Sequence, residues 1–583
     1  MYKNRLKLII ALLLSLLFLL QPLTARVSAV SEATLVSNAT LVSNATLTII
    51  GQVINTQGSG VDEVEVHVSV AGEEIVAAHT HPDGSYVLDL MLPQAQIEME
   101  TITVRVNKPG YRTIHHDLDR QEIAQDDGHY YIRVPEIVLY RVFNAAFFLA
   151  AAIFMVVFVL ISLNMLHETI AAFLGAATML GVSYIIGSFV PDFWIIDFHH
   201  AVTFIDFDVI FLLMAMMIFM AITSRTGIFQ WLAFQTFRLA RGNTFLVAAI
   251  LIVITGFTSS VLNDTTVMLL MAPVSIQIAL VLNVHPAAIV VPEILASNIG
   301  GAATLIGTPP NTIIGSYVGL SFNQFLGNML PISLIGMLIL LAMTRWLYRK
   351  EFERKGKPPS AALVAQLESG AHITDQPLLR KSLIVFGVTL VLFFTGDTFH
   401  MPPAVAAIIG STILLLWVRP NVSEMLREVD WTTLVFFMSL FMMVGGIQEV
   451  GLIQLIAEAV QNMAGENLIL ATLLVVWVSA IASAVVANIP FTAAIVPVTV
   501  FLTHTIPGAE NNVLYWALAL GAGLGGNATY IGSAPNIVAA GIMDRAGYRL
   551  KFSDFSRVGV PVTFVTILIP TLWILIRYFW LKF

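Results

Sequence analysis

The chain has 583 residues, of which 57% are hydrophobic and 11% are charged, with a formal net charge of −8 and a mean hydropathy of +0.83. A water-soluble chain carries about a quarter charged residues, so this composition excludes a soluble particle and fits one surrounded by lipid. The absence of cysteine excludes disulfides and thiolate chemistry, and without a dense basic face we expect no nucleic-acid binding.

The N-terminus has the pattern of a targeting segment. Lys3, Arg5 and Lys7 precede an apolar run at 8–20 that is short for a spanning helix. We predict that residues 1–29 form a cleaved signal peptide, with an uncleaved signal anchor as the alternative. Residues 30–47 contain a repeated Ala-Thr-Leu-Val-Ser-Asn unit and are predicted to be a polar linker.

Residues 48–140 have the pattern of a small β domain. Valines alternate with polar residues over 64–70, and turn sequences follow at 82–84 and 109–110. The segment resembles the carboxypeptidase-regulatory-like, transthyretin-like β-sandwich modules, and we expect it to lie outside the cytoplasm. Its closely spaced histidines are interpreted as surface residues and not as a metal site, because their spacing is not that of ligands.

From residue 142 onward, apolar stretches long enough to cross a bilayer follow one another. We predict a helical polytopic membrane protein with repeat 1 at 141–348, a cytoplasmic linker at 349–381 and repeat 2 at 382–583. Two stretches, 243–282 and 468–505, are interrupted by polar residues and are predicted to be re-entrant hairpins. The expected crossings lie near 142–166, 170–190, 204–223, 286–320, 328–348, 382–399, 401–418, 430–450, 512–543 and 558–580.

The two halves share an internal repeat. Segments 297–311 and 522–536 align without a gap and are identical at eight of fifteen positions. Asn263 and Asn488 are separated by the same interval as these segments, whereas the interval between Asp206 and Asp430 is shorter by one. We therefore predict two copies of one unit.

Basic residues predict how the copies are oriented. Every Lys and Arg between 142 and 576 lies in one of the segments 224–242, 346–381, 419–429 and 544–557, or at Arg345 just before the second. The positive-inside rule places these segments in the cytoplasm and the β domain outside. The repeats are then inverted, and the protein is expected in the plasma (inner) membrane.

The polar interruptions predict a binding site halfway through the bilayer. Broken helices persist at this depth only where protein or a cavity satisfies the freed backbone groups, and their ends can then bind ions. The alternative is that the small residues only allow close helix packing. The candidate substrate- and ion-binding residues are Asn263, Asp264, Thr265, Gly300, Gly301, Thr304, Asn311, Asn488, Thr492, Gly525, Gly526, Thr529 and Asn536.

Acidic residues inside a membrane are costly and often functional. Asp264 is a candidate for binding a cation or a proton, and Glu293 is a proton or cation candidate or a protonated structural acid. A dinucleotide-type glycine pattern at 521–526 lies in an apolar helix and has no preceding strand, and no phosphate-binding loop is present. We therefore expect no enzyme activity, no nucleotide and no cofactor, with Na⁺ or H⁺ as the coupling ion.

The segment Leu262–Leu270, followed by Glu293 and Ser297–Asn311, closely resembles the ion transporter superfamily. The similarity covers roughly 142–580 and is greatest to the arsenite permease and Na⁺/H⁺ antiporter branch that includes the P protein, with a relation to citrate and dicarboxylate/sodium symporters. Thr308 stands where the P-protein branch usually has an acid and is similar to the carboxylate carriers. The resemblance implies a homodimer with a scaffold and a moving transport part.

From these observations we expect an ion-coupled secondary active transporter of a small anion, and the resemblance implies a citrate-transporter-like permease with an elevator-type motion. A Na⁺/H⁺ antiporter is the first alternative, and an anion channel on the same scaffold is the second. The expected partners are a small ionic substrate, the lipid bilayer and a second copy of the chain.

Overall fold

The computed structural model describes residues 44–581, apart from 56–59, 62–63, 72, 82, 100, 109, 119–122, 127–128, 141, 164, 354–364, 366–367, 371 and 466. The expected signal segment at 1–29 and most of the expected linker lie outside the described residues. The chain forms two compact units. One comprises the residues up to Lys108 and Thr113–Tyr140, and the other comprises Pro109–Arg112 and Arg141–Phe583.

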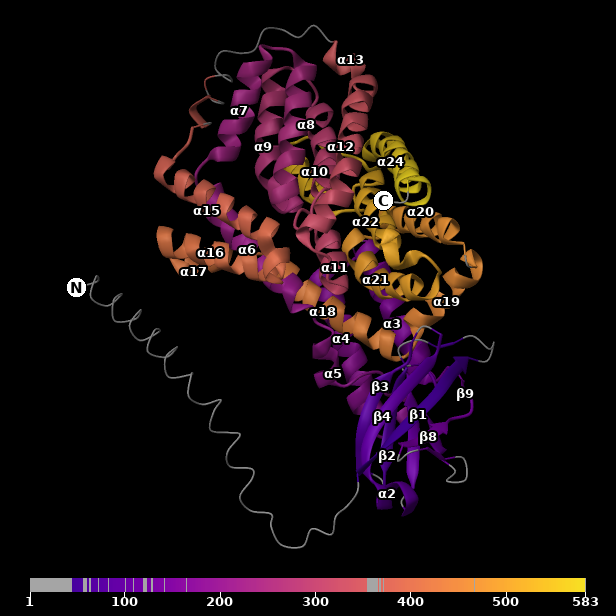
Figure 1. The fold of residues 1–583 in the computed structure, drawn as a ribbon. Helices are drawn as coiled ribbons and strands as arrows, with labels where there is room; N and C mark the ends of the chain where they lie inside the picture. Colours follow the sequence, from indigo (N-terminus) through magenta and orange to yellow (C-terminus); the bar gives the residue numbers. More distant parts are fainter. Residues whose placement is uncertain are drawn as a thin grey trace, which may run out of the picture. The chain divides into compact units, whose positions relative to one another are not determined.

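The first unit contains two β-sheets (Figure 1). One has the strand order β4-β1-β8-β7, with β9 pairing with the end of β1, and the other has the order β3-β2-β5-β6. The elements are β1 (Asn44–Asn55), β2 (Glu65–Val70), β3 (Glu73–His79), β4 (Ser85–Pro93), α2 (Gln94–Met99), β5 (Ile102–Asn107), β6 (Ile114–Asp117), β7 (Ala124–Asp126), β8 (His129–Arg133) and β9 (Ile137–Leu139).

Alternating side chains explain these strands. Val66 and Val68 of β2 are fully buried, and they pair with Val106 and Val104 of the antiparallel strand β5. Strand β1 begins at Asn44, inside the segment expected to be a linker, and pairs with β4 and β8. The expected linker boundary at residue 47 is therefore wrong, because the end of the sequence repeat already forms part of the first strand.

The second unit is helical. Its first half contains α3 (Ala145–Ser162), α4 (Glu168–Gly181) continued by η2 (Val182–Gly187), η3 (Pro191–Phe193), α5 (Phe198–Thr203), α6 (Phe207–Ser224), α7 (Ile228–Ala240), α8 (Thr244–Val261), α9 (Asp264–Val281), α10 (Ala287–Gly301), α11 (Pro309–Val318), α12 (Phe322–Leu347) and α13 (Arg349–Phe352). Its second half contains α15 (Gln376–Thr395) with η4 (Gly396–Phe399), α16 (Pro403–Val418), α17 (Val422–Glu428), α18 (Trp431–Glu449), α19 (Leu452–Ala464), α20 (Leu468–Val485), α21 (Asn488–Thr505), η5 (Ala509–Asn511), α22 (Val513–Gly525) with η6 (Gly526–Ala528), α23 (Ala534–Arg545) and α24 (Phe552–Leu575) with η7 (Ile576–Trp580).

Eleven helices of the described chain are long and apolar enough to span a membrane. Four of them are the arms of the two hairpins, α8 with α9 and α20 with α21. The remaining seven, together with the shorter apolar helices Ala287–Gly301, Pro403–Val418 and Val513–Ala528, account for the ten predicted crossings. The predicted fold class, with two interrupted hairpins and two broken helices, is confirmed.

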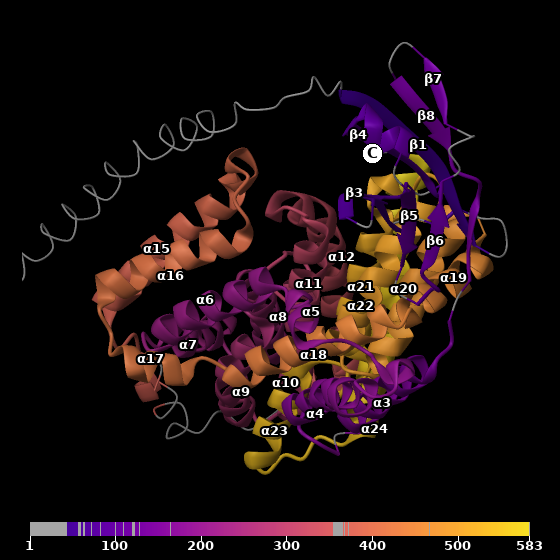
Figure 2. The same ribbon diagram turned by 90° about the horizontal axis from the view of Figure 1, so that it is seen from below.

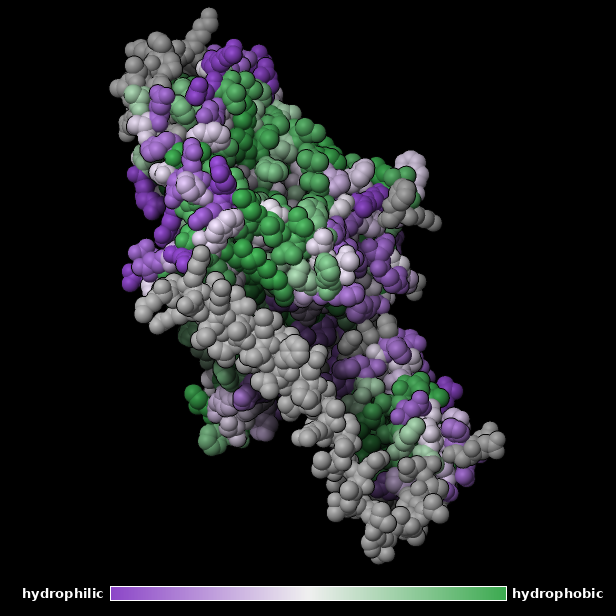
Figure 3. Space-filling model, turned by 60° about the vertical axis from the view of Figure 1, so that its left-hand side comes forward, coloured by the Kyte–Doolittle hydropathy of each residue, from purple (hydrophilic) through white to green (hydrophobic). Residues whose placement is uncertain are grey.

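The surface of the helical unit has the character expected of a lipid-facing protein. Figure 3 shows a broad area of hydrophobic residues over this unit, bordered by hydrophilic ones. Phe257, Leu338 and Leu572 are among its exposed large apolar side chains. A hydrocarbon surrounding removes the cost that such exposure has in water.

The repeat is visible in the helices themselves. Helices α6, α8 and α9 begin at positions 207, 244 and 264, and α18, α20 and α21 begin at positions 431, 468 and 488, so all three pairs of starts are separated by one common interval. The two duplicated aspartates are N-caps: Asp206 accepts a hydrogen bond from the Val209 amide (3.1 Å), and Asp430 accepts one from the Thr433 amide (3.2 Å). Both aspartates therefore fix the start of a helix.

The two repeats pack into each other. Within each repeat the first hairpin arm lies against the broken helix, α8 on α10 and α20 on α22. Between the repeats, α11 packs on α21 and α23 packs on α9; Figure 2 shows α23 beside α9 and α10. Each broken helix therefore contacts the hairpins of both repeats, which brings the two sets of predicted site residues into one region.

Candidate functional site

In repeat 1 the hairpin tip is bound to the break in the helix. The backbone amide of Asp264 donates to Gly307 O at 3.3 Å, and Thr304 Oγ1 donates to Ser260 O. The break at 302–308 separates α10 from α11. We call this contact between the tip at 260–266 and the break the first junction.

Repeat 2 has the same arrangement, the second junction, formed by the tip at 484–489 and the break at 526–533. The backbone amide of Asn488 donates to Gly532 O at 3.1 Å, and Thr529 Oγ1 donates to Ala484 O at 2.6 Å. Equivalent positions in the two breaks are one residue further apart along the chain than equivalent positions in the two tips.

These contacts change one pairing taken from the sequence. Asn488 corresponds to Asp264 and not to Asn263, because their amides bind equivalent carbonyls. Asn263 is the N-cap of α9, and its Oδ1 accepts hydrogen bonds from the amides of Thr265 (3.1 Å) and Thr266 (3.3 Å). The pairing of Asn263 with Asn488 was wrong because equivalent positions in the two hairpins are one residue closer together in the sequence than equivalent positions in the two broken helices. The pairing had used the spacing of the broken helices for the hairpins.

The common shape of the two breaks depends on a pair of asparagines. Asn311 Nδ2 donates to Thr304 O at 2.8 Å and Ala302 O at 3.2 Å. Asn536 Nδ2 donates to the equivalent carbonyl, Thr529 O, and to Gly526 O, both at 2.9 Å, and the counterpart of Gly526 O is Gly301 O, which lies 3.4 Å from Asn311 Nδ2. These carbonyls have lost their helical partners, so the two amides replace the hydrogen bonds that the breaks remove.

The first glycine of each pair serves helix packing. A Cβ on Gly300 would lie 2.0 Å from Gly256 O, and one on Gly525 would lie 2.5 Å from Ala480 O. These glycines allow α10 to touch α8 and α22 to touch α20. Gly301 and Gly526 instead adjoin their own breaks, where a Cβ would lie 3.1 Å from Gly307 O and 2.8 Å from Gly532 O.

The predicted hydroxyls fall into two kinds. Thr304 and Thr529 join a tip to a break, as described above. Thr492 Oγ1 donates to the Asn488 carbonyl at 2.7 Å within its own helix, and Thr265 Oγ1 donates to Asp264 Oδ1 at 3.2 Å. Thr265 therefore lies at the first junction, whereas the Thr492 hydroxyl is occupied by the backbone of α21.

Two acids of repeat 1 are almost completely buried. Asp264 is 1% exposed, and its Oδ1 accepts from the amide and the hydroxyl of Thr265. Glu293, on α10, is 0% exposed; its Oε1 accepts from Thr255 Oγ1 at 3.4 Å, and its Oε2 has no partner in the described chain.

The sequence interpretation missed Asn298. Its Nδ2 donates to Asn527 Oδ1 at 2.7 Å and to Asn536 Oδ1 at 2.8 Å, and its Oδ1 accepts from Ser533 Oγ at 3.0 Å. All four residues are buried. Asn298 comes from repeat 1 and its partners from repeat 2. The sequence signal was that each repeated segment contains an asparagine, Asn298 or Asn527, whose counterpart in the other segment is not an asparagine.

The first junction has no equivalent of this side chain. Asn311 Oδ1 and Thr308 Oγ1 are buried and have no hydrogen-bond partner among the residues that the structure describes. They correspond to Asn536 Oδ1 and Ser533 Oγ of the second junction. A buried acceptor without a donor is costly, so these oxygens are candidates for binding a cation.

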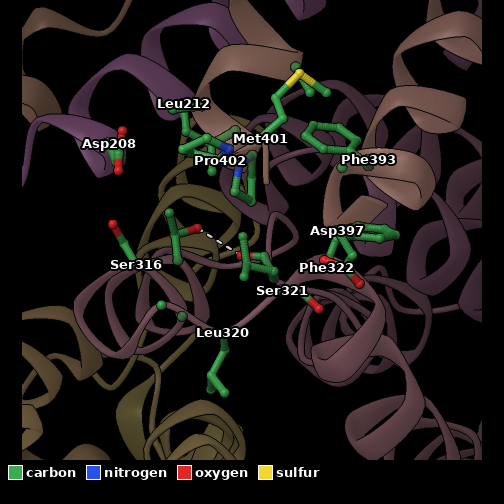
Figure 4. Close-up of a pocket in the computed structure, with 18 of the residues that line it drawn as sticks. Asp208, Leu212, Ser316, Leu320, Ser321, Phe322, Phe393, Asp397, Met401 and Pro402 are labelled. Carbon is green, nitrogen blue, oxygen red and sulfur yellow. Dashed lines mark hydrogen bonds between the residues drawn. The ribbon is translucent and has the colours of Figure 1, made fainter. Parts of the chain in front are cut away.

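A separate cavity of about 540 Å³ lies between α6, the connection from α11 to α12, and the facing ends of α15 and α16 (Figure 4). Asp208 of α6 and Asp397 of η4 line it, and Ser316 of α11 lies across the cavity from Asp208. Thr312 of α11 and Leu305 of the first break also line it, so the cavity reaches the break itself.

Comparison with known proteins identifies relatives of the chain. Residues 155–521 match the family described as CitMHS, citrate transporter. The chain is 34% identical over 431 residues to an uncharacterized transporter of Mycobacterium tuberculosis, a match covering 74% of this chain and 98% of that protein. It is 33% identical over 506 residues to the P protein of Homo sapiens, covering 74% of this chain and 60% of that protein.

Among solved structures, the Alcanivorax borkumensis YdaH transporter aligns with 71% of this chain and 99% of its own, at 13% identity and a TM-score of 0.47. The family match spans more than half of the chain, and it confirms the resemblance that the segments 262–270 and 297–311 indicated. The protein is a membrane transporter and belongs to the CitMHS citrate transporter family of the ion transporter superfamily.

Proposed function

We propose that the protein is an ion-coupled secondary active transporter of a small anion, a citrate-transporter-like permease that works by elevator-type alternating access. The observation that carries this proposal is the pair of junctions, in which two helix breaks are each bound to a hairpin tip. Because α11 packs on α21 and α23 packs on α9, the two junctions are parts of one central region. No enzymatic step is part of the proposal.

The chemistry of the junctions suits an anion. Helices α9, α11, α21 and α23 all begin there, at residues 264, 309, 488 and 534. Each helix start carries a partial positive charge and attracts anions such as carboxylates. An anionic substrate can therefore be held without an intramembrane Lys or Arg, as in other transporters with broken helices.

The first junction also suits a coupling cation, Na⁺ or H⁺. Asp264 supplies a buried carboxylate, and Thr308 Oγ1 and Asn311 Oδ1 supply oxygens without partners in the described chain. Hard cations prefer oxygen ligands, and in secondary transporters with broken helices the unwound backbone also coordinates Na⁺ or H⁺.

The moving part in this proposal comprises the hairpins and the broken helices with α12 and α24, and the scaffold comprises α3, α4, α6, α15, α16 and α18. The cavity in Figure 4 lies at the border between these parts, since α6, α15 and α16 line one side and α11 and α12 the other. A homodimer in the plasma (inner) membrane, with the β unit outside, completes the proposal.

Flux into proteoliposomes tests it. With purified protein and labelled citrate, succinate or phosphate, we expect saturable uptake that stops when the Na⁺ and H⁺ gradients are collapsed. Passive conduction that does not saturate would indicate a channel, and the absence of flux for every small anion tried would contradict the proposal.

A Na⁺/H⁺ antiporter is the second candidate, favoured by the burial of both Asp264 and Glu293. It makes a distinct prediction: addition of Na⁺ outside the vesicles would change the internal pH when no organic or inorganic anion substrate is present. A small-anion symporter would leave the internal pH unchanged under these conditions.

A further inference from the structure

Two short helices connect the scaffold to the moving part of the proposed transporter. Helix α7 runs between α6 and α8, and α19 runs between α18 and α20 (Figure 1). They begin at residues 228 and 452, so their starts are separated by the same interval as those of the hairpins. Each follows a glycine in the left-handed conformation, Gly227 with a φ of 75° and Gly451 with a φ of 82°. Because a left-handed residue ends one helix and lets the next begin in a new direction, we call α7 and α19 the hinge helices.

The loop between β5 and β6 contacts the second hinge helix. Residues 110–112 of this loop belong to the helical unit and not to the β unit. A Cβ on Gly110 would lie 2.5 Å from Gly451 Cα, so the backbones of the loop and the hinge touch. Tyr111 OH donates a hydrogen bond of 2.8 Å to Glu458 Oε1 of α19. We call residues 110–112 the second strap, since they hold both the first turn and the middle of α19.

The first hinge helix is contacted in an equivalent place by a different part of the chain. A Cβ on Gly227 would lie 2.6 Å from His372 O. Thr374 Oγ1 donates to Arg225 O, at the end of α6, at 2.8 Å. We call residues 372–374 the first strap. The two straps are not copies of one sequence, so duplication of the repeat does not explain why both of the equivalent glycines are covered.

Both straps are attached to helices that we assign to the scaffold. Thr374 directly precedes Asp375, the N-cap of α15. Gly110 O accepts a hydrogen bond of 3.0 Å from the amide of Val142, in the segment that leads into α3. Each strap therefore joins a scaffold helix to the start of a hinge helix.

Resting on the elevator-type motion of the proposed function, we infer that the two straps restrain the hinge helices and that transport requires their release. Helix α7 packs on α8 and α9, and α19 packs on α20 and α21, so each hinge helix follows its own hairpin when the moving part travels. A strap that joins this helix to the scaffold opposes the motion. Because the second strap lies between two strands of the β unit in the chain, the β unit is given a role in limiting the rate of transport.

Amide hydrogen exchange of the purified full-length protein tests the restraint without a substrate. Tyr111→Phe removes the hydrogen bond to Glu458, and Thr374→Val removes the side-chain hydrogen bond to Arg225 O. We expect exchange to become about five-fold faster in α19 for Tyr111→Phe and in α7 for Thr374→Val, the factor that one hydrogen bond contributes to a local opening equilibrium. Each variant is a control for the other, because each should leave the opposite hinge helix unchanged.

Tyr578→Phe is the matched control for the loss of a tyrosine hydroxyl. Tyr578 OH donates to Asn328 Oδ1 of α12 at 2.7 Å, a contact between two elements of the moving part. Glu458→Gln keeps an acceptor for Tyr111 and should exchange like the wild type. Exchange in α19 that is equal in Tyr111→Phe and Tyr578→Phe would overturn the inference, and so would unchanged exchange of α7 in Thr374→Val.

Uptake of labelled citrate into proteoliposomes relates the restraint to transport. We expect both strap variants to raise the maximal rate by up to about five-fold at an unchanged half-saturating concentration, because neither strap contains a junction residue. Faster exchange in the hinge helices with an unchanged maximal rate would overturn the release step while leaving the proposed transporter intact. If the wild type takes up no small anion, the proposed function fails, and the exchange measurement alone decides whether the straps restrain the hinge helices.

Discussion

Ser316 Oγ donates a hydrogen bond of 2.9 Å to the Asp206 carboxylate, which also caps α6. This contact joins α11, which we assign to the moving part, to the scaffold helix α6. In repeat 2 the residue equivalent to Ser316 is Gly541, so the contact occurs on one side of the molecule only. It is therefore specific to the conformation of this structure if α11 moves against α6.

Ser316→Ala removes this contact and leaves the cap intact. We expect the conformation seen here to lose about 1 kcal/mol of stability relative to the other transporter conformations, the usual contribution of one hydrogen bond. The ratio between the conformations should therefore shift about five-fold. Accessibility labelling of a cysteine at 208, in the cavity of Figure 4, measures that balance. Ser439→Ala is the control, since Ser439 Oγ donates only within its own helix, to Val435 O; equal labelling in both variants would show that the contact does not hold the conformation.

Asp264→Asn gives the first junction the amide that the second has in Asn488. We expect the variant to fold, because an amide can keep the contact with Thr265, and to lose Na⁺-dependent uptake by more than about ten-fold, because the negative charge is gone. Uptake assays with and without Na⁺ measure this. Na⁺ dependence equal to that of the wild type would exclude Asp264 as the cation ligand.

Asn263→Ala tests the revised role of the neighbouring residue. As the N-cap of α9, Asn263 should contribute about 1 kcal/mol to the free energy of unfolding, which Asn263→Ala removes. Asn263→Asp should keep this stability because an aspartate caps a helix equally well. The thermal unfolding temperature and the uptake rate of both variants measure this. If Asn263→Asp restores stability but not transport, Asn263 binds substrate directly.

Much of the architecture was predictable because a polar residue in an apolar stretch is a strong signal. The interruptions at Asn263 and Asn488 located both hairpins, and the repeated segments 297–311 and 522–536 located both helix breaks. The pairing of Asp264 with Asn488 was not predictable, because the small difference between the two intervals is visible only in which carbonyl each amide binds. The start of β1 was missed because the repeated segment was read by its composition and not by its alternation.

The role of Asn298 was hidden for a different reason. A search for duplicated residues selects what the repeats share, and Asn298 matters because its counterpart, Gly523, differs. Contacts between repeats depend on pairs of non-equivalent positions, such as Asn298 with Asn527. The sequence does not show which residues of the two repeats face each other until the packing of α10 on α23 is known.

Glu293→Gln tests proton transfer. The amide keeps an oxygen for Thr255 Oγ1, which donates to Glu293 Oε1 at 3.4 Å, so the fold should be retained. If Glu293 carries a proton during transport, the variant should lose the pH dependence of uptake, since glutamine does not titrate. Uptake measured between pH 5.5 and pH 8.5, a range of about three units around neutrality, checks this. A profile that matches the wild type would assign Glu293 a structural role.

Gly300→Ala and Gly525→Ala test whether these glycines act through packing. The new Cβ would lie 2.0 Å from Gly256 O in one case and 2.5 Å from Ala480 O in the other. Both acceptors are backbone atoms, so the helices must separate, and we expect a loss of roughly 1–3 kcal/mol in each variant with a lower unfolding temperature. Gly541→Ala is the matched control, because a Cβ there has no heavy atom within 4 Å. Variants that keep their stability and lose only substrate affinity would mean that the glycines face the substrate, and the close approach of α10 to α8 would then not be the reason for their presence.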